Sequence, residues 1–123
     1  MNRKGFIVIH EEDDLIRELL ERWLVEGGYA VVVASREELP LPAAERPRLV
    51  IADFPSPRGA HARIQSLQAV YAAPILVLSA RFRRGLAGSA ETARRLGVKK
   101  VLPKPFTRKE LLSAVDESLE SAA

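Results

Sequence analysis

The feature that most constrains the fold is residues 49–53, four apolar residues followed by a single carboxylate, Asp53. A short continuous apolar run of this kind is typical of a strand buried on both faces of a parallel sheet. The carboxylate cannot share that dry layer without a partner. We therefore expect Asp53 at the carboxyl edge of the sheet, where open α/β sheets bind their ligands.

Three other apolar runs lead to polar residues in the same way. The first precedes Glu11 and Glu12, the next leads to Ser79, and the last leads to Lys104. A β-branched segment lies between the first run and the run that ends in Asp53, and it is a further strand candidate. The predicted strands are residues 5–10, 29–34, 48–52, 74–78 and 99–103.

Helical connections are expected between these strands. Asp13 or Asp14 can cap a helix that ends at the glycine pair beginning with Gly27. Further helices are predicted over residues 60–71, weakly over 91–96, and after Thr107, which forms a capping box with Glu110. Strands that alternate with helices predict an α/β fold with a doubly wound parallel sheet. The apolar positions assigned to the buried helix faces include Leu15, Trp23 and Val70.

Length and composition exclude several classes of protein. A chain of 123 residues predicts one domain spanning residues 1–123, and the lack of cysteine excludes disulfides and thiolate metal sites. No apolar run approaches the roughly 20 residues of a membrane helix, and no signal-peptide pattern begins the sequence. We expect a cytoplasmic protein. The net charge is +3, but the basic residues are dispersed, so direct nucleic-acid binding is not expected.

The polar residues after the strands suggest one site. The ends of the first and third strands can meet where the winding of the sheet reverses, which brings Glu11 and Glu12 near Asp53. Three carboxylates repel one another unless a cation joins them, and Mg²⁺ prefers such oxygen ligands. Lys104 and Ser79 could each contact a phosphoryl oxygen. Together these residues predict phosphoryl transfer to a carboxylate, with Asp53 as the nucleophile.

This pattern resembles the receiver domain of two-component response regulators. The resemblance rests on the acidic pair, on Asp53 with Pro57 four residues later, on Ser79-Ala80, and on Leu-Pro-Lys-Pro-Phe at 102–106. It covers about residues 5–119. It implies a flavodoxin-like fold, in which a five-stranded parallel sheet of order 2-1-3-4-5 carries helices on both faces.

The resemblance also implies a role for each matching residue. Asp53 would be the phosphoacceptor, Ser79 the switch hydroxyl, and Lys104 the residue that pairs with the phosphoryl group. The Lys104–Pro105 peptide bond would be cis. The implied Mg²⁺ ligands are Glu11, Glu12, Asp53 and the backbone carbonyl of Pro55.

The partners implied by the resemblance are a histidine kinase or phosphotransfer protein as donor, and a downstream protein target or effector domain. The protein would be a regulatory phosphoacceptor, with at most self-catalysed phosphorylation and dephosphorylation, rather than an enzyme. A homodimer through the face of the last two helices is left open.

Three hypotheses follow, and we predict the phosphorylation-dependent switch. The sequence departs from the family at the Glu-Glu pair, where Asp-Asp is usual, at Pro55, which lacks an amide hydrogen, and at Val101, where many members carry an aromatic ring. These departures favour the second hypothesis, a pseudo-receiver that binds a partner without phosphorylation. The third is a small phosphatase or nucleotide-binding enzyme, but no glycine-rich loop follows the first strand.

Overall fold

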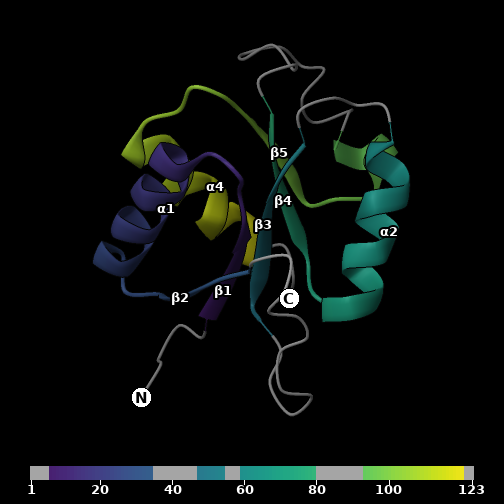
Figure 1. Cartoon of the computed structure of the whole chain (residues 1–123), viewed down its shortest axis with the longest axis horizontal. Coiled ribbons are helices and arrows are strands. Elements are labelled where there is room, and N and C mark those ends of the chain that lie inside the picture. The colour runs from purple at the N-terminus through teal and green to yellow at the C-terminus, as the bar shows by residue number, and fades with distance from the viewer. Residues whose placement is uncertain (1–5, 35–46, 55–58, 80–92, 121–123) are drawn as a thin grey trace.

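The computed structural model describes residues 6–34, 47–54, 59–79 and 93–120 of the chain (Figure 1). The helices in these ranges are α1 (Asp14–Glu26), α2 (Ala60–Tyr71) and α4 (Arg108–Glu120), and residues 93–96 are also helical. The strands are β1 (Phe6–His10), β2 (Ala30–Val33), β3 (Leu49–Asp53), β4 (Ile75–Ser79) and β5 (Lys100–Pro103).

The strands form one sheet in the order β2-β1-β3-β4-β5, and every neighbouring pair is parallel. Helices α1 and α4 cover one face of this sheet and α2 covers the other (Figure 1). This arrangement confirms the predicted doubly wound, flavodoxin-like α/β fold with strand order 2-1-3-4-5. Because all strands run the same way, their carboxyl ends lie at a single edge of the sheet.

The strands are buried on both faces, as their continuous apolar runs predict. Along β1, Ile7 and Ile9 pack with α1 and α4, whereas Val8 packs with α2 on the opposite face. In β3 all four apolar residues have no solvent exposure. The alternation follows from the pleat of a strand, in which successive side chains point to opposite faces.

The helix ends follow local capping chemistry. Asp13 is the N-cap of α1, and its carboxylate accepts a hydrogen bond of 3.0 Å from the amide of Ile16. At the start of α4, the amide of Glu110 donates to the Thr107 hydroxyl at 3.1 Å, and the amide of Thr107 donates to the Glu110 carboxylate at 2.9 Å. These contacts confirm the predicted capping box.

Several apolar helix positions that were expected to be buried are exposed, among them Leu15 and Val70. Leu15 is 68% exposed and Val70 is 52% exposed, although both belong to apolar runs on helices. The stripe that faces the sheet in α1 passes through Leu20 and Leu24, and Leu15 lies to one side of it. Trp23, in contrast, packs against the core as predicted, with its ring at 69° to that of Phe106 and 6.3 Å away.

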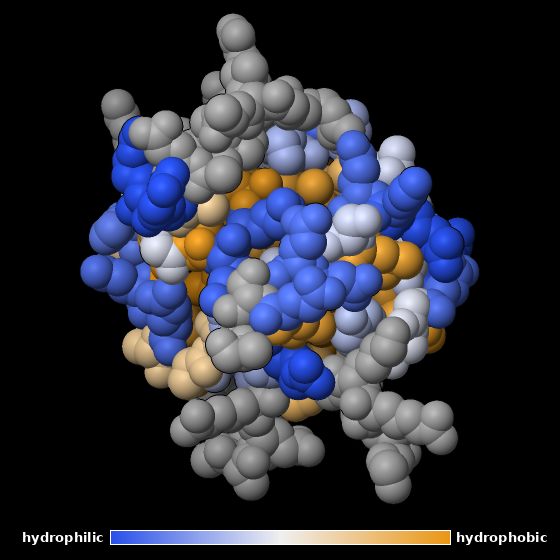
Figure 2. Space-filling view, turned by 180° about the vertical axis from the view of Figure 1, so that it is seen from behind, coloured by the Kyte–Doolittle hydropathy of each residue, from blue (hydrophilic) through white to orange (hydrophobic). Residues whose placement is uncertain are grey.

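Parts of the predicted secondary structure lie outside the described residues. These are the turn after Ser35, the loop at 81–85 and the start of the helix predicted over 91–96. Within the described ranges, no helix combines the length and apolar character needed to cross a membrane. Seen from behind, the described surface is largely hydrophilic, with hydrophobic residues visible between the polar ones (Figure 2).

The hydrogen bond between Tyr29 and Asp116 gives a testable pH dependence. Tyr29 lies just before β2, and its hydroxyl donates to the Asp116 carboxylate of α4 at 3.1 Å. Burial, followed by this bond, raises the pKa of Tyr29 to about 12, and burial also raises the pKa of Tyr71. The stability that Tyr29 contributes is therefore fully present below pH 10 and is lost as the pH rises toward about 12.

Titration of tyrosinate absorbance measures this effect, because the chain has two tyrosines. We expect both midpoints of the folded protein to lie above those of the protein unfolded in guanidinium. Tyr29→Phe should remove the transition near pH 12. A folded protein whose tyrosines both titrate near pH 10, as free tyrosine does, would contradict this assignment.

Candidate functional site

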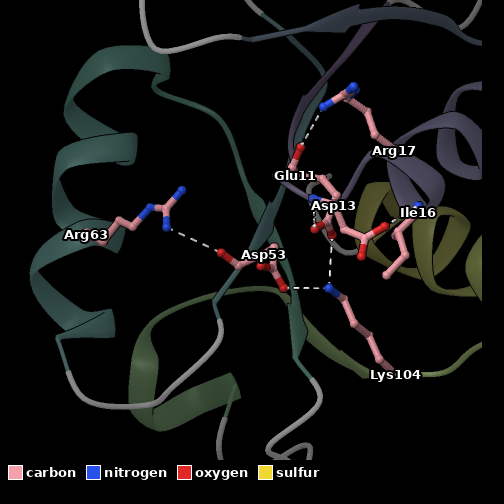
Figure 3. Close-up of polar contacts among 7 residues, drawn as sticks. All are labelled: Glu11, Asp13, Ile16, Arg17, Asp53, Arg63 and Lys104. Carbon is pink, nitrogen blue, oxygen red and sulfur yellow. Dashed lines mark hydrogen bonds and ion pairs between the residues drawn. The ribbon is translucent and has the colours of Figure 1, made fainter.

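Three strand ends bring charged side chains together at the carboxyl edge of the sheet (Figure 3). Glu11 directly follows β1, Asp53 ends β3, and Lys104 directly follows β5. Strands β1 and β3 are neighbours, with His10 paired to Ala52. On the other side of β3, Asp53 pairs with Leu78, and the next residue of β4 pairs with Pro103. The sheet order therefore converts three distant sequence positions into one cluster.

The ammonium of Lys104 lies between two carboxylates. Its Nζ atom is 2.7 Å from Oδ1 of Asp53 and 3.1 Å from Oε1 of Glu11. The side chains are 14%, 18% and 1% exposed for Lys104, Asp53 and Glu11, so solvent screens these pairs much less than it screens a surface ion pair. The structure thus brings together three of the residues that the sequence analysis assigned to the site.

The electrostatic balance keeps Lys104 charged. Burial lowers its pKa, but the hydrogen bond to Asp53 and the negative charges of Glu11 and Asp53 outweigh that effect, and the net shift is upward. With both carboxylates ionised, one ammonium faces two negative charges. Taken alone, these three side chains then carry a formal charge of −1.

Glu11 has one oxygen that its surroundings leave incompletely satisfied. Its Oε2 atom accepts a hydrogen bond of 3.1 Å from the amide of Asp13. Its Oε1 atom is buried and lies at ion-pair distance from Lys104, yet no donor in the described part of the chain makes a hydrogen bond to it. A buried polar atom without a hydrogen bond is unusual, and coordination of a cation is one way to satisfy it.

The donor chemistry at this edge fits Mg²⁺. Glu11 and Asp53 supply hard carboxylate oxygens, while Glu12 is exposed and Pro55 lies outside the described residues. In the ranges that the structure describes, no three acidic or histidine side chains converge closely enough to form a metal site alone. Mg²⁺ usually takes only one or two carboxylates and keeps several waters, so two carboxylates and a backbone carbonyl are a compatible set.

Ser79 is positioned by the backbone next to this cluster. It is the last residue of β4, it has no solvent exposure, and its carbonyl accepts a hydrogen bond of 2.9 Å from the amide of Lys104. The Lys104–Pro105 peptide bond is cis, which confirms that prediction. The backbone hydrogen bond between Lys104 and Ser79 places the end of β5 beside the residue that was predicted to be the switch hydroxyl.

Sequence reasoning missed the contacts on the α2 side of the edge. Arg63 donates from Nη1 to the backbone carbonyl of Asp53 at 3.4 Å and lies over the ring of Phe54. His10 shares a hydrogen bond of 2.9 Å with the Tyr71 hydroxyl, and burial, followed by the charge of Arg63, lowers its pKa. One sequence feature could have indicated these contacts, because Arg63 is the only Asp, Glu, Lys or Arg residue in α2.

Comparison with known proteins identifies the fold family. No family model matches the sequence, and no curated protein matches it either. A response regulator receiver protein from Burkholderia phymatum is 26% identical, with a TM-score of 0.72 over 95% of this chain and 96% of the other. The chain has the structure of a receiver domain.

More distant structures show the same fold. A chemotaxis response regulator of Vibrio cholerae is 24% identical, with a TM-score of 0.67 over 94% of this chain and 98% of its own. An orphan response regulator of H. pylori is 18% identical, with a TM-score of 0.68 over 97% of this chain and 99% of its own. The similarity of this chain to response regulators such as the protein from Burkholderia phymatum supports a regulatory role in two-component signalling.

Removing the ammonium of Lys104 from the cluster should destabilise the protein. Lys104→Met leaves Glu11 and Asp53 buried side by side without their shared cation. We expect the free energy of unfolding to fall by about 2 kcal/mol at pH 7, less than for a fully buried pair because Lys104 and Asp53 keep some access to water. Urea unfolding without divalent cations, followed by the fluorescence of Trp23, measures the change.

Glu11→Gln in the Lys104→Met background is the matched control. It removes one of the two carboxylates and should restore part of the lost stability, because mutual repulsion disappears. If Lys104→Met unfolds at the same urea concentration as the unchanged protein, the ammonium does not hold the cluster together.

Proposed function

We propose that this receiver domain is a phosphorylation-dependent switch in a two-component phosphorelay, with Asp53 as the phosphoacceptor. The observation that carries the proposal is the 2.7 Å contact between the Lys104 ammonium and the Asp53 carboxylate at the carboxyl edge of the sheet. A nucleophilic carboxylate needs a fixed position and a nearby positive charge, because the incoming phosphoryl group is itself an anion. The ammonium of Lys104 holds the carboxylate of Asp53 in place and provides the positive charge.

The reaction transfers one phosphoryl group. An oxygen of the Asp53 carboxylate attacks the phosphorus atom of the donor and forms a new P–O bond. The P–O or P–N bond to the donor breaks, and the leaving group departs with the bonding electron pair. Lys104 then moves its charge toward a phosphoryl oxygen, and the hydroxyl of Ser79 donates to another. The buried position of Ser79 means that its neighbours must repack for this contact.

We assign Glu11, Glu12, Asp53 and the backbone carbonyl of Pro55 as the residues that would hold Mg²⁺. When bound, the ion would supply positive charge for the phosphoryl oxygens. The formal negative charge of Glu11, Asp53 and Lys104 taken together and the buried Oε1 atom of Glu11 support this assignment. Binding through Glu12 requires its exposed side chain to turn toward the cluster.

The proposed partners are a histidine kinase or phosphotransfer protein as donor and a protein target or effector domain as receiver of the signal. The role of the domain is regulatory: it undergoes one modification and its removal, rather than turnover of a substrate. A cytoplasmic location stays a prediction.

Intact mass after incubation with acetyl phosphate tests the proposal. We expect the added mass of one phosphoryl group in the presence of Mg²⁺, a much smaller yield after chelation, and no adduct on Asp53→Asn. That variant keeps the shape of the side chain but lacks the nucleophilic carboxylate. An adduct of equal yield on Asp53→Asn would assign the modification to another residue.

A pseudo-receiver is the second candidate, and one contact favours it. Glu11 reaches Lys104 at 3.1 Å, so a carboxylate competes with any phosphoryl group for that ammonium. Mg²⁺-dependent binding of beryllofluoride, a mimic of the phosphoryl group, separates the two candidates. A switch should bind it at Asp53, whereas a pseudo-receiver should show no binding at any Mg²⁺ concentration.

A further inference from the structure

Arg63 of helix α2 contacts the backbone of Asp53, the proposed phosphoacceptor. Its Nη1 atom donates to the carbonyl of Asp53 at 3.4 Å (Figure 3). Its guanidinium carbon lies 5.2 Å from the centre of the Phe54 ring. A guanidinium stays charged at any ordinary pH and is attracted to the face of an aromatic ring. The contact is therefore electrostatic in both of its parts.

The peptide group between Asp53 and Phe54 is held from both ends. Its carbonyl accepts from Arg63, and its N–H donates to the carbonyl of Leu78 on β4 at 2.9 Å. The side chain of Phe54 is 2% exposed and packs in the core between the sheet and α2. These two hydrogen bonds restrain the backbone from which the side chain of Asp53 projects.

Two basic side chains, Lys104 after β5 and Arg63 in α2, contact different groups of Asp53. Figure 3 shows its carboxylate directed toward Lys104 and its carbonyl directed toward Arg63 on the opposite side. Lys104 is largely buried, whereas the contact made by Arg63 is exposed. The N···O distance of 3.4 Å for Arg63 exceeds the usual 2.7–3.2 Å of a hydrogen bond, so this contact has room to shorten.

A second contact joins α2 to the neighbouring strand end. Tyr71, in the last turn of α2, is 3% exposed and shares a hydrogen bond of 2.9 Å with His10. His10 is the last residue of β1 and directly precedes Glu11. Helix α2 is thus attached by polar side chains to the ends of both strands that carry the carboxylates of the site.

We propose that Arg63 is a positioning residue that links the peptide group of Asp53 to α2, so that α2 shifts when Asp53 is modified. The inference rests on the proposed phosphorylation of Asp53. Phosphorylation replaces the single negative charge of the carboxylate with about two on the phosphoryl group, a net gain of about one, and attracts the guanidinium more strongly. The attraction shortens the contact of Arg63 with the Asp53 carbonyl and moves the first turn of α2 with it.

Amide chemical shifts of residues 60–71, measured by NMR with Mg²⁺ before and after adding beryllofluoride, test this link. We expect clear shift changes along α2 in the unchanged protein. In Arg63→Gln they should fall by roughly half or more, because a charge-assisted hydrogen bond is about twice as strong as a neutral one. Arg63→Lys keeps the charge and should recover part of the response.

Arg22→Gln is the matched control, because Arg22 is an exposed arginine of α1, on the other face of the sheet. It changes the net charge equally and should leave the α2 response unchanged. Thermal unfolding of all variants checks that they are equally folded, and intact mass checks that each accepts a phosphoryl group from acetyl phosphate.

The outcomes separate the two proposals. If the unchanged protein neither binds beryllofluoride nor gains a phosphoryl group, the proposed function fails and the link to α2 fails with it. If Asp53 is modified but α2 responds equally in Arg63→Gln, the function stands and the role of Arg63 is overturned. If Arg63 has only a structural role, Arg63→Gln should lower stability and leave the shift changes in α2 as they are. That result would also overturn the inference.

Discussion

The ammonium of Lys104 is the interaction on which the rest of the site depends. Two carboxylates that are largely removed from water, Glu11 and Asp53, would be strongly unfavourable beside each other without a cation. Lys104 can reach both because β5 ends two strands away from β3, with all carboxyl ends at one edge. Taken alone, the ionised side chains of Glu11, Asp53 and Lys104 carry a formal charge of −1. Carboxylate oxygens are ligands that Mg²⁺ prefers, and an ammonium is suited to pair with a phosphoryl oxygen.

Much of this architecture could be predicted from the sequence, because it follows from apolar sequence patterns and from interactions between residues close in the chain. The continuous apolar runs of β3 and β4 can only be buried between two layers of helices, and the structure shows them so. The capping box at Thr107 is a short-range pattern and fixes the start of α4. The convergence of Asp53 and Lys104 followed from the rule that parallel strands end at the same edge.

Other features of the site depend on how the helices and side chains are oriented in space, which the sequence pattern does not specify. The exposure of Leu15 depends on how α1 is rotated about its axis against the sheet, and apolar spacing alone did not determine that rotation. From the sequence, Glu11 and Glu12 were predicted to have the same role, yet only Glu11 is buried beside Lys104. The attachment of α2 to the site through Arg63 joins residues that are ten positions apart in the sequence, and only the structure reveals it.

The central claim is that Asp53 itself accepts the phosphoryl group, and chemical trapping of that group tests it most directly. Borohydride reduces an aspartyl phosphate to homoserine, whereas it leaves a free carboxylate unchanged. After treatment with acetyl phosphate and Mg²⁺, peptide mapping by mass spectrometry should find homoserine at position 53 and unmodified Glu11 and Glu12. Conversion at another acidic residue, or no conversion in a protein shown to be folded, would contradict the account.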